Sequence, residues 1–104
     1  MLMKTREILP LVGSVVQVVT IFGARVTGRL DGVGNGRFGG KLVRLGGGVR
    51  LARQRMDEER PARVETVALS VCQTIRPADA HEVEAWREAD LHIAAAARGA
   101  VVVP

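Results

Sequence analysis

The sequence predicts a mainly β fold: a small, strongly bent barrel of five strands, with a short helix before it and an added α-helix after it. Short runs rich in valine, isoleucine and leucine follow one another at intervals that suit strands. Ten of the 12 glycines fall between Gly23 and Gly48, where a small barrel needs turns and sharp bends. Residues 78–98 instead contain no glycine or proline and are rich in alanine, glutamate and arginine, which favours a helix.

The first predicted element is a short helix over residues 4–12, which Pro10 limits to about two turns. The β-branched run at residues 15–22 predicts a strand. Residues 25–31 alternate between apolar and polar side chains, so we expect a half-buried strand that forms a hairpin with the first. Residues 32–40 are predicted to be a glycine-rich loop. The later predicted elements are strands over residues 41–45, 49–53, 64–71 and 73–76, a glycine turn at 46–48 and a charged loop at 54–63.

The final element is a helix over residues 78–98, with Asp79 as its N-cap and Gly99 as its C-cap. Its apolar residues recur at helical spacing along one face: Val83, Trp86, Ala89, Ile93 and Ala97. Trp86 and Ile93 are therefore candidates for packing on the sheet or for contact with a partner protein. Residues 100–103 are expected either to add an edge strand or to form an unpaired tail.

Length and composition predict one domain, in which a barrel over residues 1–77 carries the helix and tail of residues 78–104. Cys72 is the only cysteine, which favours a reducing compartment. The uncharged run at residues 8–24 is shorter than the ~20 apolar residues that a spanning helix needs and is rich in strand formers. We therefore expect a cytoplasmic protein with no membrane contact.

Charge is divided unevenly along the chain, although the net charge is +4. Residues 1–56 hold ten basic and two acidic residues, whereas residues 57–104 hold five basic and nine acidic ones. Arginine side chains suit phosphates, and Phe38 in the glycine-rich loop is placed to stack on a base. The candidate nucleic-acid-binding residues are Arg25, Arg29, Asn35, Arg37, Phe38, Lys41 and Arg44. The alternative is an arginine-rich surface without a ligand, whose charges serve self-assembly with the acidic helix.

No catalytic signature is present in the sequence. Residues 34–39 match GxGxxG, but the following residues predict a strand where a dinucleotide site requires a helix. His81, Glu88 and His92 share one helix face, but they span about 16 Å, too far for one metal ion. We therefore expect no enzyme activity, metal, cofactor or small-molecule substrate.

Residues 8–33 resemble the first motif of the Sm/LSm family, which is a short helix, a strand, a turn glycine and a hydrophobic residue followed by x-Gly-x-Leu. The matching segments are Ile8-Leu-Pro-Leu-Val-Gly13, Val15-Val-Gln-Val-Val19 and Gly23-Ala-Arg-Val-Thr-Gly28-Arg-Leu30. Gly34 and Phe38 stand where the family has the Asp and Asn of its RNA-binding loop, and Asn35 is the nearest polar substitute.

This resemblance implies an Sm-like, SH3-like barrel, a homo-oligomeric ring of identical subunits and contact with RNA through loops. The alternative function is a structural or adaptor barrel that mediates protein assembly without nucleic acid, with Trp86 of the helix as the contact residue.

Overall fold

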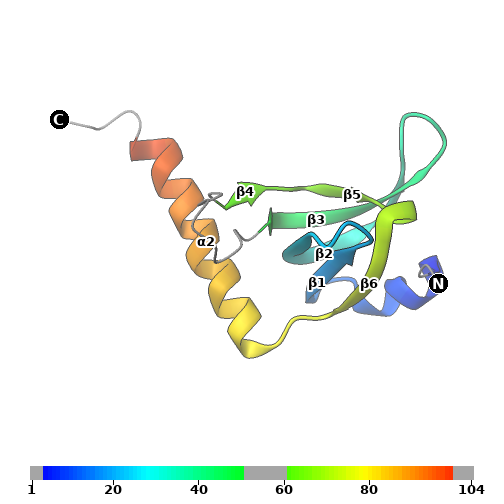
Figure 1. Cartoon of the computed structure of the whole chain (residues 1–104), viewed down its shortest axis with the longest axis horizontal. Coiled ribbons are helices and arrows are strands. Elements are labelled where there is room, and N and C mark those ends of the chain that lie inside the picture. The colour runs from blue at the N-terminus through cyan, green and yellow to red at the C-terminus, as the bar shows by residue number, and fades with distance from the viewer. Residues whose placement is uncertain (1–3, 51–60, 100–104) are drawn as a thin grey trace.

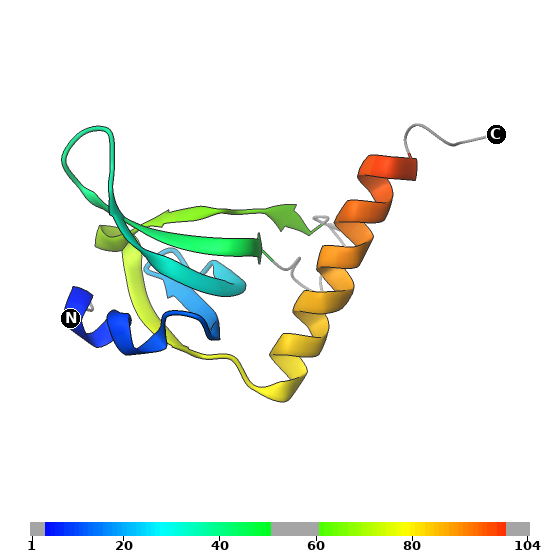
Figure 2. The same cartoon turned by 180° about the vertical axis from the view of Figure 1, so that it is seen from behind.

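The computed structural model of the chain describes residues 4–50 and 61–99, and Figures 1 and 2 show it from opposite sides. The fold is mainly β, with an antiparallel sheet between a short N-terminal helix and a long C-terminal helix, as predicted. The elements in chain order are α1 (Thr5–Ile8), the 3-10 helix η1 (Leu9–Leu11), β1 (Val15–Thr20), β2 (Arg25–Asn35), β3 (Lys41–Arg50), β4 (Ala62–Arg63), β5 (Thr66–Ala68), the 3-10 helix η2 (Leu69–Val71), β6 (Cys72–Pro77) and α2 (Ala80–Gly99).

The strands form one sheet in the order β4-β3-β2-β1-β6, and β5 also pairs with β3. Every pair is antiparallel. Among the described strands, β6 pairs only with β1, while β4 and β5 pair only with β3. The hydrogen-bonded sheet is therefore open, with β6 at one edge and β4 and β5 at the other.

The hydrophobic core lies on one face of this sheet, because apolar residues alternate with polar ones along the strands. Ile8 of α1 is fully buried against it. The core strand residues are Val16, Val18, Val26, Leu30, Val43, Leu45, Val67, Cys72 and Ile75. This packing explains why the N-terminal helix, although short, has a defined position against the sheet.

The prediction of a turn at residues 46–48 is wrong, because β3 runs through all three glycines. A Cβ on Gly28 would lie 2.7 Å from the Cα of Gly48, and a Cβ on Gly48 would overlap the carbonyl oxygen of Val64. Glycine is required here so that neighbouring strands can approach closely. Gly47 has a φ of +62°, and the β2–β3 register shifts at this point, so the glycines form an irregularity within a strand.

Several other predicted boundaries also differ. β2 continues to Asn35, so the loop predicted at residues 32–40 is shorter and includes only residues 36–40. The strand predicted at residues 64–71 is β5 followed by η2. β1 ends at Thr20, before the turn that contains Ile21 and Phe22. These differences arise because ladder pairing with a neighbour, which the local pattern does not specify, decides where a strand ends.

The predicted C-terminal helix is confirmed as α2, which begins directly after Asp79. Gly99, predicted to follow the helix, is its last residue. α2 contacts β2 and β3 on the outer face of the sheet. The predicted strand beyond residue 50, residues 54–60 of the loop predicted at 54–63, and the tail at residues 100–104 lie outside the described residues. Residues 62–63 of that predicted loop instead form β4, which pairs with β3.

Candidate nucleic-acid interface

The loop between β2 and β3 extends away from the rest of the sheet (Figure 1). The Gly36 N–H donates to the Gly40 carbonyl oxygen at 2.5 Å, and the Gly39 N–H donates to the Gly36 carbonyl oxygen at 3.2 Å. Gly39 has a φ of +87°, a conformation that favours glycine. These bonds close the loop, so Arg37 and Phe38 occupy its outer end.

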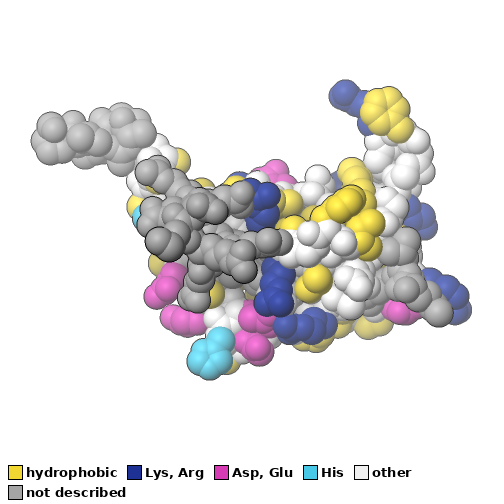
Figure 3. All heavy atoms as spheres, viewed as in Figure 1, with side chains coloured by type: hydrophobic (Ala, Val, Ile, Leu, Met, Phe, Trp, Pro, Cys, Tyr) yellow, Lys and Arg dark blue, Asp and Glu magenta, His cyan; other side chains and the backbone are white. Residues whose placement is uncertain are grey.

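Phe38 is 96% exposed, more than any other large hydrophobic residue among those described. In Figure 3 a hydrophobic side chain and a basic side chain stand out together at the end of this loop. The core therefore does not account for Phe38. An exposed aromatic ring next to a cation is the type of group on which a nucleic-acid base stacks.

Three basic residues belong to the same hairpin, Arg37 at its outer end and Lys41 and Arg44 in β3. Among the described residues, no carboxylate lies within ion-pair distance of Arg37, Lys41 or Arg44. The Lys41 Nζ donates a long hydrogen bond of 3.4 Å to the Thr5 hydroxyl oxygen. The Arg44 guanidinium lies across Gly34, where a Cβ would come within 2.7 Å of its Nε. These positive charges are therefore available to an anion from outside the chain.

The structure brings together only part of the predicted set, namely Asn35, Arg37, Phe38, Lys41 and Arg44, with Asn35 and Lys41 as direct partners across the ladder. Arg29 lies farther back along β2 and forms an ion pair of 3.4 Å with Asp31. Arg25 lies at the opposite end of β2, where its charge contributes to lowering the pKa of Glu82. Arg25 and Arg29 are therefore not part of the hairpin surface.

Trp86 is directed at the sheet of its own chain. Its indole Nε1–H donates to the Gly47 carbonyl oxygen at 2.8 Å, and the ring is half-buried. The Arg63 Nη1 donates to the same oxygen at 3.0 Å and to the Asp90 carboxylate at 2.6 Å. Ile93, one turn after Asp90, is also half-buried. Both predicted helix residues therefore lie on the side of α2 that meets the sheet.

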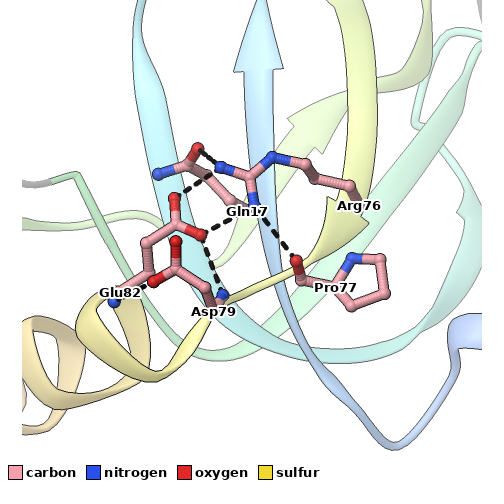
Figure 4. A network of polar contacts seen from close by, with 5 residues as sticks. All are labelled: Gln17, Arg76, Pro77, Asp79 and Glu82. Atoms are coloured by element: carbon pink, nitrogen blue, oxygen red, sulfur yellow. Dashed lines mark hydrogen bonds and ion pairs between the residues drawn. The ribbon is translucent and has the colours of Figure 1, made fainter.

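A polar network that the sequence patterns did not predict lies at the start of α2 (Figure 4). The two terminal nitrogens of Arg76 each donate to one carboxylate oxygen of Glu82, both at 2.7 Å. Arg76 also donates to the Gln17 amide oxygen at 2.8 Å and to the Pro77 carbonyl oxygen at 3.1 Å. Glu82 and Asp79 bond to each other's backbone N–H groups, which forms a capping box. The spacing of Asp79 and Glu82 was the sequence signal for this network.

The same network shifts the pKa values of Glu82 and Arg76. The hydrogen bonds from Arg76 lower the pKa of Glu82, although burial opposes this effect. The bond to Glu82 in turn raises the pKa of Arg76. This ion pair is therefore fully charged at neutral pH.

The histidines of α2 and the thiol of Cys72 are the side chains that would suggest metal binding or catalysis, and they lie in different parts of the structure. His81 and His92 are exposed on α2, and the described residues contain no group of three or more His, Cys, Asp or Glu that could hold a metal ion. Cys72 is buried, and its thiol donates to the Ala68 carbonyl oxygen at 3.3 Å. Burial raises the pKa of Cys72 to about 11, so the reactive thiolate is scarce at neutral pH.

Comparison of the chain with protein families, with curated proteins and with solved structures finds no match. In the ranges 4–50 and 61–99, no helix has the length and apolar character needed to cross a membrane.

Proposed function

We propose that the protein is a non-enzymatic Sm-like barrel that assembles into a homo-oligomeric ring and binds RNA or another single-stranded nucleic acid through the β2–β3 hairpin. The observation that carries the proposal is the exposed Phe38 beside Arg37, with Lys41 and Arg44 behind them and no carboxylate paired with these cations among the described residues. The aromatic ring offers a stacking platform, and the cations neutralise phosphates.

The barrel is supported by the connection between the two edges of the sheet. β5 pairs with β3, β6 pairs with β1, and only η2 separates β5 from β6 along the chain. A tight turn between opposite edges is what closure of a small sheet requires. The resemblance of residues 8–33 to the Sm/LSm family supports the same form.

Assembly into a ring is supported by the two edges that remain unpaired in the described sheet, at β6 and at β4 and β5. Pairing the β6 edge of one copy with the opposite edge of the next is a head-to-tail contact, which generates rings when the rotation closes. Assignment of the protein to the cytoplasm belongs to this proposal and is supported by Cys72 being the only cysteine.

The nucleic-acid hypothesis is tested with a fluorescent oligouridylate and the full-length protein, by anisotropy over a range of salt concentrations. Arg37→Glu should weaken binding by about tenfold and reduce the salt slope by about 0.7, because one phosphate contact is lost. Phe38→Ser should weaken binding by a similar factor with little change in slope, because a stacked base is lost. A duplex of the same length should bind less tightly, since its bases are already stacked.

Arg87→Glu is the matched control, because it makes the same charge change on the exposed side of α2. If Arg87→Glu weakens binding as much as Arg37→Glu, the hairpin is not the site. Absence of binding by the wild type at low salt would contradict the nucleic-acid hypothesis altogether. Molar mass by light scattering, before and after RNase treatment, tests the ring: a monomer in both measurements would contradict it.

The alternative is a structural or adaptor barrel without nucleic acid, and one observation favours it. Ile21 and Phe22 are 53% and 76% exposed in the β1–β2 turn, where polar residues are usual. Adjacent exposed apolar side chains are typical of a protein contact. If Phe22→Ser reduces the molar mass of the assembly while the wild type binds no oligouridylate, the adaptor function replaces the first proposal.

A further inference from the structure

Five residues in five neighbouring strands face one another across the sheet. The register pairs them in sequence, and we name them the outer row: Arg63 in β4, Val49 in β3, Thr27 in β2, Gln17 in β1 and Arg76 in β6. Cross-strand partners share a face, and the row members in β1 and β2 alternate with core residues. The outer row therefore lies on the face opposite the core, with an arginine at each end.

α2 covers the outer row and is held at three points by polar contacts. Asp90 bonds to Arg63 at one end, with 2.6 Å between Oδ1 and Nη1. At the other end, the Glu82 carboxylate accepts two hydrogen bonds from the Arg76 guanidinium, as Figure 4 shows. Between them, the Trp86 indole donates to a carbonyl oxygen of β3. Both arginines of the outer row are therefore neutralised by carboxylates of the helix that covers them.

The helix side of this interface contains little fully buried apolar surface. Among residues 80–97 of α2, only Ala89 is buried, while Val83, Trp86 and Ile93 are half-buried. Beneath the helix, Thr27 is fully buried, and its hydroxyl oxygen has no hydrogen-bond partner in the part of the chain that the structure describes. An unmatched buried hydroxyl costs about 1–3 kcal/mol, so the closed arrangement leaves one polar group of the sheet unsatisfied. A helix with few buried apolar contacts also separates from its domain at low cost.

The chemistry beneath α2 matches a polyanion. A guanidinium fork that binds a carboxylate with two parallel hydrogen bonds binds a phosphate equally well. Glu82 and Asp90 are eight residues apart on α2, which places them about 12 Å apart along the helix axis. A flexible single strand can bring two of its phosphates to that separation. Gln17 and Thr27 lie between the two arginines and supply polar groups for a base or sugar.

We propose that the outer row is a second site for single-stranded nucleic acid, and that α2 closes it by placing Glu82 and Asp90 where phosphates would bind. The inference rests on the proposed function for the class of ligand, but it does not require the hairpin to bind. In both Figure 1 and Figure 2 the hairpin loop and α2 lie at opposite ends of the sheet, so the two sites are separate.

The test uses full-length protein in which the hairpin carries Arg37→Glu and Phe38→Ser, so that the hairpin contributes little to the binding of oligouridylate. Adding Glu82→Gln and Asp90→Asn should tighten binding by about tenfold, because the closed population no longer competes with the ligand. Adding Arg63→Gln and Arg76→Gln to that protein should remove the gain. Circular dichroism confirms that each variant remains folded.

The matched control is Glu84→Gln with Glu88→Gln, which removes two negative charges from exposed positions of α2. An equal gain in this control would assign the effect to net charge and overturn the proposal, as would no gain with Glu82→Gln and Asp90→Asn. Trp86→Phe removes one α2 contact without changing charge, and it should give a smaller gain in the same direction.

Two further outcomes separate this proposal from the first. A gain in the hairpin variant supports the outer row even if Arg37→Glu alone leaves wild-type binding unchanged. Dimerisation without a gain in affinity, measured by light scattering, would identify α2 of a second copy as the occupant and overturn the proposal.

Discussion

At the loop end of the β2–β3 ladder, a Cβ on Gly39 or Gly40 would meet no atom within 4 Å. At the α2 end, a Cβ on Gly28 would meet the backbone of β3, and one on Gly48 would meet the backbone of Val64, between β4 and β5. Glycine therefore serves different purposes at the two ends. It shapes an exposed loop at one end and permits close strand packing at the other.

The arginines differ in the same way between these two regions. Arg37 and Arg44 near the loop have no ion pair among the described residues, while Arg63 and Arg76 beneath α2 bind Asp90 and Glu82. An arginine-rich composition thus does not identify a binding surface. A surface is open to an external anion only where the chain does not already supply one, so the arginines beneath α2 become available only when the helix leaves them.

The largest expected effect is a loss of stability at the crowded end. Gly48→Ala should lower the free energy of unfolding by about 3 kcal/mol or more, because its methyl group would overlap the Val64 carbonyl oxygen. Gly40→Ala, with open space around it, should change stability by less than about 0.5 kcal/mol. Urea unfolding measures both, and similar losses would show that the two ends are packed alike.

The next effect concerns the attachment of α2. Trp86→Ala should cost about 2 kcal/mol, because a half-buried ring and its hydrogen bond to the Gly47 oxygen are lost. Trp86→Phe should cost about 1 kcal/mol, because it removes mainly the hydrogen bond. Leu91→Ala, at an exposed position of α2, is the control and should be nearly neutral. Equal effects of Trp86→Ala and Leu91→Ala would contradict docking through Trp86.

A smaller effect depends on pH. Glu82 has a lowered pKa in the folded protein, through its bonds to Arg76 and to the Asp79 N–H and through the nearby charges of Arg76 and Arg25. Its stabilisation should be fully present above about pH 4.3, the pKa of an unperturbed glutamate, and be lost as the pH falls through the folded value. Glu82→Gln should remove this part of the acid dependence of unfolding, whereas Glu84→Gln should retain it.

The smallest expected effect concerns the core, where the alkylation rate of Cys72 should hardly respond to changes at α2. Cys72 is buried and its pKa is raised to about 11, so alkylation by iodoacetamide should be slow in the native protein. Weakening the attachment of α2 by Trp86→Phe should leave that rate within about twofold of wild type, because Cys72 belongs to the core on the other face. Rapid alkylation in that variant would indicate that the core opens together with α2.

Local patterns predicted many of the elements. The β-branched run identified β1, alternation of apolar and polar residues identified the first part of β2, and the 3.6-residue spacing with Asp79 at its start identified α2. The same reasoning failed at residues 46–48, where three glycines resemble a turn but pass through β3 beneath α2. Nothing nearby in the sequence indicates that β4 and Trp86 lie against that segment.

The candidate site was likewise predictable from the sequence only in part. Exposure of Phe38 and Arg37 followed from a glycine-rich loop whose outer end the sequence located, although β2 extends four residues into the predicted loop. The separation of Arg25 and Arg29 from that loop, and the pairing of Arg63 and Arg76 with α2, required the sheet register and the path of the helix. Periodicity specifies which face a residue occupies. Contacts between segments distant in the chain decide which charge meets which, because such contacts depend on how strands and helix pack in three dimensions.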